Sequence, residues 1–476
     1  MIFTMIGGGA HRLLATTRSA LKEGVFQRGG EIRLYDLDEK RSHDMAVMIQ
    51  KSPEYRACPV PVRYKLSLEE ALEGADLVSI TLLAGGGKVL ALESALGWSY
   101  GFIGSDNISY PGAFLALRDA PIIMNIAKKM EQYCPKAVLL DFANPVSVVS
   151  AMVNQFTSIR CYGICEGHNN HGWDLTRILT GEDRYSPDMD VDVAGVNHLS
   201  WILRGKWRGR DIFEMLDERI STVPDWWKHI SFTAEKTEFV QKQMIDGMRK
   251  LVSLYQHRGA LLFSTEGDGY SHFFHQEVVG THSGWIHAKD KEGLLESVCM
   301  KRLEDETLRS AQSRKEANLA FEAYTKMEAD DIPWDSKMLH LFAVPDKGDV
   351  TVRILCGLAG VENTRVAVSH INNGAVSNID SSLSLEFTHT VDQDGLHPVQ
   401  GLKIPVGVYG MTAALAEHQT LLATACGTSD PHDLYRALLA YPIGADTKAA
   451  RELWSKLLIT SREYIAPSFQ ELQSYL

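Results

Sequence analysis

The sequence predicts an α/β protein in which a Rossmann-like, doubly wound domain is followed by an α+β domain. Apolar runs at 2–6, 31–35, 60–64, 75–82 and 136–141 alternate with helical patterns, which is typical of βαβ units. The first run ends in Gly7-Gly8-Gly9, a tight turn before a helix. With 476 residues the chain is too long for one ordinary domain. We therefore expect two domains, at 1–196 and 197–476, with one shared site between them.

Composition and charge exclude several classes of protein. Hydrophobic residues make up 45% of the chain and charged residues 23%, as in a soluble globular protein. The net charge of -12 argues against nucleic acid or an anionic membrane as a partner. No apolar run approaches the roughly 20 residues of a membrane span, and the first residues predict no leader. Seven scattered cysteines fit reduced thiols, so we expect a cytoplasmic protein.

The glycine turn at the end of the first run predicts a dinucleotide site. A strand, a glycine turn and a helix N-terminus together favour a pyrophosphate group. Gly7 and Gly9 fill the first two glycine positions of the fingerprint, whereas Arg12 stands at the third. The alternative interpretation is an ordinary tight turn.

Asp36 at the end of the second run supports the dinucleotide interpretation. It follows Gly9 by 27 residues (36 − 9), somewhat beyond the spacing of about 20 expected for a ribose-binding carboxylate. Its charge would repel a 2′-phosphate, so the predicted cofactor is NAD rather than NADP. The alternative is that Asp36 and Asp38 cap the following helix.

Asn144 follows another predicted strand, at 136–141, which comes after a predicted helix at 114–134. Because Pro145 holds Asn144 in an extended conformation, its amide should point into the crevice at the carboxyl ends of the strands. The alternative is a simple turn residue.

Cys165 and His198 each follow an apolar, strand-like run, which predicts that they share a divalent metal ion. Taken singly, such a cysteine is more often a small buried hydrophobe and such a histidine a hydrogen-bonded polar side chain. A structural zinc site would need four closed ligands, whereas two ligands leave positions for water or substrate. The pair therefore indicates a catalytic ion.

The remainder of the chain predicts helices and a small mixed sheet, as suits a second, substrate-binding domain. Helical spacing is predicted at 235–256, 304–330, 406–425 and 431–439. Strands are predicted at 350–355, 365–369 and 383–391.

Several motifs, in order along the chain, resemble those of glycoside hydrolase family 4, the NAD- and divalent-metal-dependent glycosidases. The motifs are Gly7-Gly8-Gly9, Tyr35-Asp36-Leu37-Asp38, Pro111-Gly112-Ala113-Phe114 with Leu117-Arg118, Ala143-Asn144-Pro145, Gly163-Ile164-Cys165, Ala194-Gly195-Val196-Asn197-His198, Ile371-Asn372-Asn373-Gly374-Ala375-Val376-Ser377-Asn378-Ile379 and Val391-Asp392-Gln393-Asp394-Gly395-Leu396-His397-Pro398. The NAD-dependent members of this family are an exception to the two-carboxylate mechanism of most glycosidases.

The resemblance implies a cofactor, a metal and several site residues. It implies the architecture of the lactate/malate dehydrogenase-like superfamily, NAD as cofactor, and a homodimer or homotetramer. Cys165 and His198 would bind the metal, usually manganese, although ligand softness alone would favour zinc or iron. Asn144 and Asn197 would contact the substrate or metal-bound hydroxyls, and Arg118 would lie near the substrate channel.

The chemistry that the resemblance implies begins with hydride transfer from the sugar C3 carbon to NAD. The C3 ketone acidifies the C2 proton, and the metal stabilises the enolate. A base then removes the C2 proton, the aglycone leaves, water adds, and NADH returns the hydride. The cofactor is therefore not consumed overall.

The base is where the chain departs from the family. Members use a tyrosine or an aspartate, but the aspartate position corresponds to Thr265, which cannot serve as a base. The run at 263–266 is somewhat nearer the alpha-galactosidase branch. Tyr270, Asp268 and Glu266 are the candidates; a packed aromatic and a turn between glycines are the alternatives for the first two.

Glu166, which follows the metal cysteine, is the second departure. Phosphoglucosidases carry aspartate or asparagine there, and several members that take unphosphorylated sugars carry histidine. A carboxylate facing the substrate would repel a 6-phosphate or a uronate, so we expect a non-phosphorylated hexoside. Rival interpretations are an NAD-dependent dehydrogenase of a hydroxy acid or sugar, and a non-catalytic NAD-binding sensor.

Overall fold

The computed structural model describes residues 1–165, 167, 170–186, 189–233, 236–263, 312, 315–336, 339 and 349–476. Its strands are β1 (Ile2–Ile6), β2 (Glu31–Tyr35), β3 (Val62–Arg63), β4 (Leu77–Ile80), β5 (Val138–Asp141), β6 (Arg160–Gly163), β7 (Met189–Val196), β8 (Leu199–Trp207), β9 (Arg210–Asp211), β10 (Leu261–Leu262), β11 (Thr364–Ile371), β12 (Ser384–Asp392) and β13 (Gly395–Pro398). Its helices are α1 (Arg12–Lys22), α2 (Glu39–Lys51), α3 (Pro53–Ala57), α4 (Leu68–Leu72), α5 (Gly86–Ser99), α6 (Tyr110–Tyr133), α7 (Val146–Phe156), α8 (Asn170–Thr180), α9 (Ile212–Thr222), α10 (Glu238–Arg258), α13 (Val350–Leu358), α14 (Val406–Thr428), α15 (Pro431–Leu439) and α16 (Lys448–Thr460). An unlabelled helix lies at 315–325.

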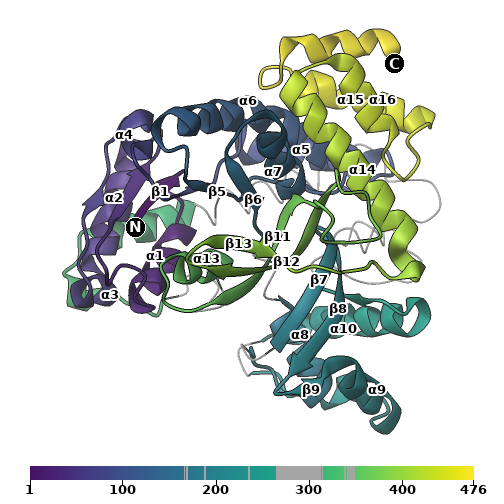
Figure 1. Ribbon diagram of the computed structural model, residues 1–476, viewed down its shortest axis with the longest axis horizontal. Helices are drawn as coiled ribbons and strands as arrows, with labels where there is room; N and C mark the ends of the chain where they lie inside the picture. Colours follow the sequence, from purple (N-terminus) through teal and green to yellow (C-terminus); the bar gives the residue numbers. More distant parts are fainter. Residues whose placement is uncertain are drawn as a thin grey trace.

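The first six strands form the parallel half of one sheet, in the order β3-β2-β1-β4-β5-β6. This order is that of a doubly wound dinucleotide-binding fold. It confirms the predicted α/β fold class, and Figure 1 shows helices on both sides of these strands. The strands are apolar on both faces because both are covered: Leu139 packs in one core, and its neighbours Val138 and Leu140 pack in the other.

The second half of the chain extends the same sheet with antiparallel strands. β11 pairs with β6, and beyond it the order continues β12-β7-β8-β10. The register places Gly163, Ser369, Glu386 and Gly195 opposite one another in a single row across four strands. A boundary at 196/197 would fall in the turn between β7 and β8, and it stays a prediction.

Local sequence signals explain several helix starts. Ser67 and Glu70 form a capping box at α4, and Ser109 caps α6, whose second residue is Pro111. The predicted helix at 235–256 is confirmed as α10, and those at 406–425 and 431–439 as α14 and α15. Only part of the helix predicted at 304–330 lies in the described residues.

The strand predicted at 350–355 is wrong, because these residues begin helix α13. Asp349 caps this helix, since its carboxylate accepts hydrogen bonds from the backbone N–H groups of Thr351 and Val352. Most of α13 is buried, so its sequence lacks the polar face that would distinguish a helix from a buried strand.

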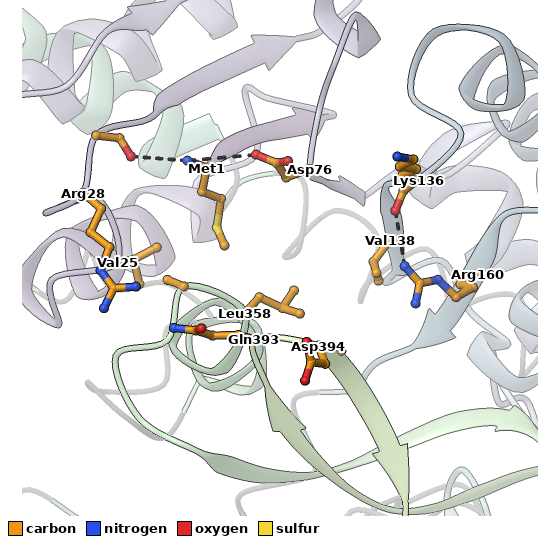
Figure 2. Close-up of a pocket in the computed structure, with 13 residues that line it drawn as sticks. Met1, Val25, Arg28, Asp76, Lys136, Val138, Arg160, Leu358, Gln393 and Asp394 are labelled. Carbon is orange, nitrogen blue, oxygen red and sulfur yellow. Dashed lines mark hydrogen bonds and ion pairs between the residues drawn. The ribbon is translucent and has the colours of Figure 1, made fainter.

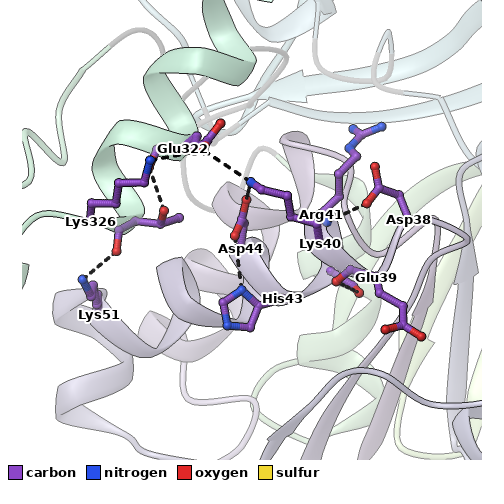
Figure 3. A network of polar contacts seen from close by, with 11 residues as sticks. Asp38, Glu39, Lys40, Arg41, His43, Asp44, Lys51, Glu322 and Lys326 are labelled. Carbon is purple, nitrogen blue, oxygen red and sulfur yellow. Dashed lines mark hydrogen bonds and ion pairs between the residues drawn. The ribbon is translucent and has the colours of Figure 1, made fainter.

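The helix at 315–325 returns to the half of the protein that holds the parallel strands and lies beside α2. The ammonium group of Lys51 donates to the backbone oxygens of Thr325 and Met327, at 2.9 and 2.6 Å. Lys40 lies between Asp44 and Glu322, at 2.6 and 3.8 Å (Figure 3). These exposed pairs add little stability, but the contacts fix where the helix lies.

A hollow of about 360 Å³ lies at the amino ends of the parallel strands, between them and the β12–β13 hairpin. Met1, Asp76, Lys136 and Arg160, which precede or begin four strands, line one side, and Asp394 lies on the other (Figure 2). Ligands of doubly wound sheets bind at the opposite, carboxyl ends. A ligand site is therefore expected at the carboxyl ends of the parallel strands. Within the described ranges, every helix is too short or too polar to span a bilayer.

We expect the substitution Asp349→Ala to lower the free energy of unfolding by about 2 kcal/mol, which combines a lost helix cap with a lost buried hydrogen bond. The buried hydrogen bond runs from the Thr16 hydroxyl on α1 to the Asp349 carboxylate, at 2.5 Å, and is additional to the two bonds of the cap. Asp211→Ala is the matched control, because Asp211 caps α9 through the same two-bond pattern. It should cost about 1 kcal/mol. Equal losses in urea denaturation would contradict the role of the Thr16 contact.

Candidate active site

The glycine turn after β1 lies against the end of β2. The backbone N–H groups of Gly7 and Gly8 both donate to the backbone oxygen of Tyr35, at 2.9 and 2.8 Å. Gly7 has a φ of +81°, and a Cβ there would lie 2.0 Å from the backbone oxygen of Thr81. Only glycine fits this position, which brings the turn to the edge of the sheet where a pyrophosphate is expected.

Asp36 is held at the edge of the same turn. Its two carboxylate oxygens accept hydrogen bonds from the backbone N–H groups of Gly9 and Asp38, at 2.9 and 3.0 Å. The capping function, which was the alternative for both acids, belongs to Asp38, whose side chain accepts from the N–H of Arg41. Asp36 instead lines a cleft.

This cleft, called the nucleotide cleft below after the cofactor that the sequence predicts there, has a volume of about 1040 Å³ and lies at the carboxyl ends of β1, β2 and β4. Gly7 and Asp36 line one part of it, and residues 82–87 line another. Ala317 and Asn318, from the helix at 315–325, also line it, so the second half of the chain completes the cleft. Its size suits a dinucleotide, because ligand clefts commonly measure about 300–1,000 Å³.

Arg12, at the third position of the glycine fingerprint, is the first residue of α1 and lines the nucleotide cleft. Its guanidinium lies 3.7 Å from the centre of the Phe142 ring. His11 before it stacks on Phe321, at 4.6 Å between ring centres, and burial followed by the charge of Arg41 lowers the pKa of His11. A helix N-terminus and a cation thus replace the third glycine at the place where phosphate is expected.

Cys165 and His198 lie side by side in the structure. Cys165 follows β6 by two residues and His198 follows β7 by two, and the Cys165 Sγ lies 3.7 Å from the His198 Nε2. One divalent ion can contact both atoms, because metal–sulfur and metal–nitrogen bonds measure about 2.3 and about 2.1 Å. His198 has a φ of +68°, an uncommon backbone conformation that is often found at functional sites.

The described residues contain no group of three or more His, Cys, Asp and Glu side chains placed to hold a metal ion. In the described part of the chain, Cys165 and His198 are therefore a pair of possible donors without a third such side chain beside them. Thiolate and imidazole are both suitable donors for a transition metal, so the pair fits a divalent ion with positions open to other ligands.

A chain of amide side chains adjoins Cys165 and His198, called the metal pair below after their predicted role, through Asn197, the neighbour of His198. The Asn107 Nδ2 group donates to the Oδ1 atoms of Asn144 and Asn197, at 3.2 and 2.7 Å. Asn144 in turn donates to Asp106, at 3.1 Å. The structure thus brings together Asn144 and Asn197, for which the family resemblance implies substrate contacts. Their link is Asn107, which sequence reasoning missed because it lies in a loop without a strand-end pattern.

Glu386 closes this amide network at its other end. Its carboxylate accepts from Asn197 Nδ2 at 2.8 Å and from the Ser200 hydroxyl at 2.5 Å. Burial raises the pKa of Glu386, while the bonds from Ser200 and Asn197 and the nearby His198 oppose that rise. Sequence reasoning also missed this buried carboxylate, which fixes Asn197 and Ser200 on either side of His198. The one available signal was a glutamate inside a predicted strand.

Arg118 lies in the core of the protein. The side chain is fully buried and ion-paired with Glu93, whose side chain is also fully buried, at 2.7 Å. Its remaining Nη1 group is directed at the backbone oxygen of Ala84, behind the wall of the nucleotide cleft. A buried cation requires such partners, so Arg118 supports this wall from the protein side.

The four remaining predicted site residues, Glu166, Glu266, Asp268 and Tyr270, lie outside the described residues.

Comparison with known proteins identifies the family. The family 4 glycosyl hydrolase model matches residues 2–180, and the family 4 glycosyl hydrolase C-terminal domain matches residues 193–443. The protein belongs to family 4 of the glycosyl hydrolases. It is thus a member of a family of glycosidases, in agreement with the resemblance carried by the motifs.

Relatives within this family match the chain along its whole length. A probable 6-phospho-beta-glucosidase of Bacillus subtilis (strain 168) is 22% identical over 480 residues, with 98% of each chain covered. An alpha-galacturonidase of the same strain is 25% identical over 468 residues, covering 95% of this chain and 96% of the relative. A 6-phospho-alpha-glucosidase from gut microorganisms, solved in complex with NAD and Mn²⁺, has a TM-score of 0.73 at 19% identity, and 98% of each chain is covered. This last likeness shows a shared fold.

We expect the substitution Asp119→Asn to flatten the pH dependence of stability. Burial raises the pKa of Asp119 from 3.8 to about 7, and its bond from the Ala84 N–H opposes the rise. Between these pH values the folded protein binds more protons than the unfolded chain, so this carboxyl destabilises the fold as the pH rises. The free energy of unfolding of the variant should therefore fall less steeply than that of the unaltered protein from about pH 4 to about pH 7.

Urea denaturation at several pH values across this window measures the slope. Asp394→Asn is the control, because Asp394 is an exposed aspartate at the hollow opposite the cleft. Its slope should match that of the unaltered protein. If Asp119→Asn also has the slope of the unaltered protein, folding does not raise the pKa of Asp119, and the expectation is wrong.

Proposed function

We propose that the protein hydrolyses O-glycosides of a non-phosphorylated hexose, with NAD and a divalent metal ion, manganese, as its cofactors. The observation that supports this most directly is the pair of Cys165 and His198 beside an amide network and a nucleotide cleft at the same edge of the sheet. When bound, NAD supplies hydride transfer at the sugar C3 carbon and the metal supplies Lewis-acid stabilisation of negative charge.

The nucleotide cleft provides the positions that NAD requires. Asp36 presents a carboxylate to the two ribose hydroxyls and disfavours a 2′-phosphate. Gly7 lines the cleft and lets the backbone approach the pyrophosphate, Gly9 holds Asp36 through its backbone N–H, and Arg12 offers a positive charge at the start of α1. Asn144 belongs to the amide network that adjoins the metal pair.

The amide network orients the sugar. Asn144 and Asn197 are held by Asn107, and the Asn107 Oδ1 atom is buried without a hydrogen-bond partner among the described residues. We infer that these amides bind sugar hydroxyls, which both donate and accept hydrogen bonds. Glu386 anchors the network, because it fixes the Asn197 amide and the Ser200 hydroxyl.

The proton at the sugar C2 carbon requires a base, and we retain Tyr270, Asp268 and Glu266 as its candidates. A tyrosine near a cation can have its pKa lowered enough to accept a proton, whereas a carboxylate is already ionised near neutral pH. The substitutions Tyr270→Phe, Asp268→Asn and Glu266→Gln should therefore differ in their effects on the pH profile of the cleavage rate.

The preference for a neutral sugar is supported by the charges of the site. The amide network contains Asp106 and Glu386 and, among its described members, no lysine or arginine. Glu166 would add a third carboxylate. The relatives reported above are named for phosphorylated or uronate sugars, and substrates with such anionic groups need cations for recognition.

We also propose that the protein is a homodimer or homotetramer in the cytoplasm. Light scattering of the purified protein tests the oligomeric state.

We expect the substitution Cys165→Ser to weaken Mn²⁺ binding by more than about 100-fold, because loss of an outer-shell partner alone commonly costs about 10–100-fold. Isothermal titration with Mn²⁺ under reducing conditions measures the change. Cys58→Ser is the matched control, since Cys58 is a partly exposed thiol after α3. NAD binding should be unchanged in both variants. Unaltered Mn²⁺ affinity in Cys165→Ser would exclude this cysteine as a ligand.

A matched substrate panel tests the reaction and the sugar. Neutral, 6-phosphorylated and uronate glycosides are incubated with NAD and Mn²⁺ in deuterated water. We expect cleavage of neutral hexosides, deuterium at C2 of the product, and no net NADH. Cleavage of 6-phosphorylated substrates alone would contradict the substrate class. Net NADH from a hydroxy acid or a sugar would instead favour a dehydrogenase, and NAD binding without any turnover would favour a sensor.

A further inference from the structure

One wall of the nucleotide cleft is a glycine-rich segment, residues 83–87, which comprises the end of the loop after β4 and the first two residues of α5. Gly85 and Gly86 have φ values of +77° and +67°. Glycines leave the backbone free to adopt many conformations, so ordering a loop of this kind on ligand binding carries an entropic cost. The wall is preformed only if neighbouring residues hold it.

Ala84 is held by two consecutive residues of α6. Its backbone N–H donates to the Asp119 Oδ1 atom at 2.7 Å, and its backbone oxygen accepts a hydrogen bond from the Arg118 Nη1 group. Both polar backbone groups of Ala84 are thus bound by side chains from a helix, which fixes the loop just before its glycines.

Arg118 is itself oriented by Glu93 on α5. The Nε and Nη2 groups of Arg118 donate to the two oxygens of Glu93, at 3.1 and 2.7 Å, and both side chains are fully buried. This two-bond pairing directs the remaining Nη1 group at Ala84. A buried ion pair is weak evidence of net stabilisation, so its geometry points to a positioning role.

The end of α16 completes the arrangement. Ser461 follows this helix, and its buried hydroxyl donates to the Glu93 Oε1 atom at 2.6 Å. In Figure 1, α16 lies near the end of the chain, far along the sequence from the nucleotide-binding strands. A hydrogen-bonded series therefore runs from Ser461 through Glu93 and Arg118 to Ala84.

We propose that Arg118, Glu93 and Ser461 are positioning residues that preform the wall of the nucleotide cleft and thereby set the affinity for NAD. The inference rests on the NAD dependence in the proposed function, but it does not depend on the sugar or the metal. Loosening the series adds the ordering cost of the loop to the binding equilibrium. NAD affinity falls, while the metal pair at Cys165 and His198 is unaffected.

The test compares Arg118→Lys and Ser461→Ala with the unaltered protein. A lysine cannot make the two bonds to Glu93 and the bond to Ala84 together, so NAD binding should weaken by at least about tenfold. Ser461→Ala removes a single oxygen atom and one bond at the far end, and it should weaken NAD binding about threefold. Calorimetric titrations give the dissociation constants for NAD and for Mn²⁺, without any glycoside. Hydrogen–deuterium exchange of the peptide covering 82–87, without NAD, reports the loop directly.

Ser455→Ala is the matched control, because Ser455 lies on α16 and donates to Gln473 instead of to Glu93. We expect it to leave NAD affinity and exchange at 82–87 unchanged. Weaker NAD binding, faster exchange at 82–87 and unchanged Mn²⁺ affinity in Arg118→Lys and Ser461→Ala support the inference. Unchanged NAD affinity, or an equal loss of Mn²⁺ affinity, overturns it. If the unaltered protein binds no NAD, the proposed function fails, and the exchange measurement still decides whether the series holds the loop.

Discussion

The site depends on one junction in the sheet, where the antiparallel strand β11 pairs with the last parallel strand, β6. This pairing, at Ser369 and Gly163, joins the nucleotide-binding strands to the strands that carry His198. Without it, Cys165 would belong to one sheet and His198 to another, and their separation would vary with any movement between the two. A continuous backbone ladder makes that separation a property of the fold.

The same junction explains how the amide network is held in place. Glu386 lies on β12 in the row that contains Gly163, Ser369 and Gly195, so strand pairing determines where its carboxylate lies. Its partners Asn197 and Ser200 stand on either side of His198 in the sequence. Buried polar networks of this kind specify one arrangement of side chains, since an unsatisfied member costs about 1–3 kcal/mol.

Features close together in the sequence, or marked by the end of a strand, could be predicted. The glycine turn, Asp36, Asn144, Cys165 and His198 each follow an apolar run, and the edge of a doubly wound sheet collects such positions. The network through Asn107 and Glu386 could not be predicted, because it depends on pairing between strands far apart in the chain. The buried position of Arg118 could not be predicted either, because a motif does not show how deeply its residues are buried.

The backbone at His198 limits which residues could replace it during evolution. A φ of +68° is tolerated by glycine, asparagine, aspartate and histidine far better than by other residues. Among these, only histidine and aspartate are common ligands of transition metals. A cysteine or glutamate could bind an ion equally well but would strain the turn. In the proposed metal site, the choice of ligand at position 198 would therefore be set by the geometry of a two-residue turn as much as by the chemistry of the metal.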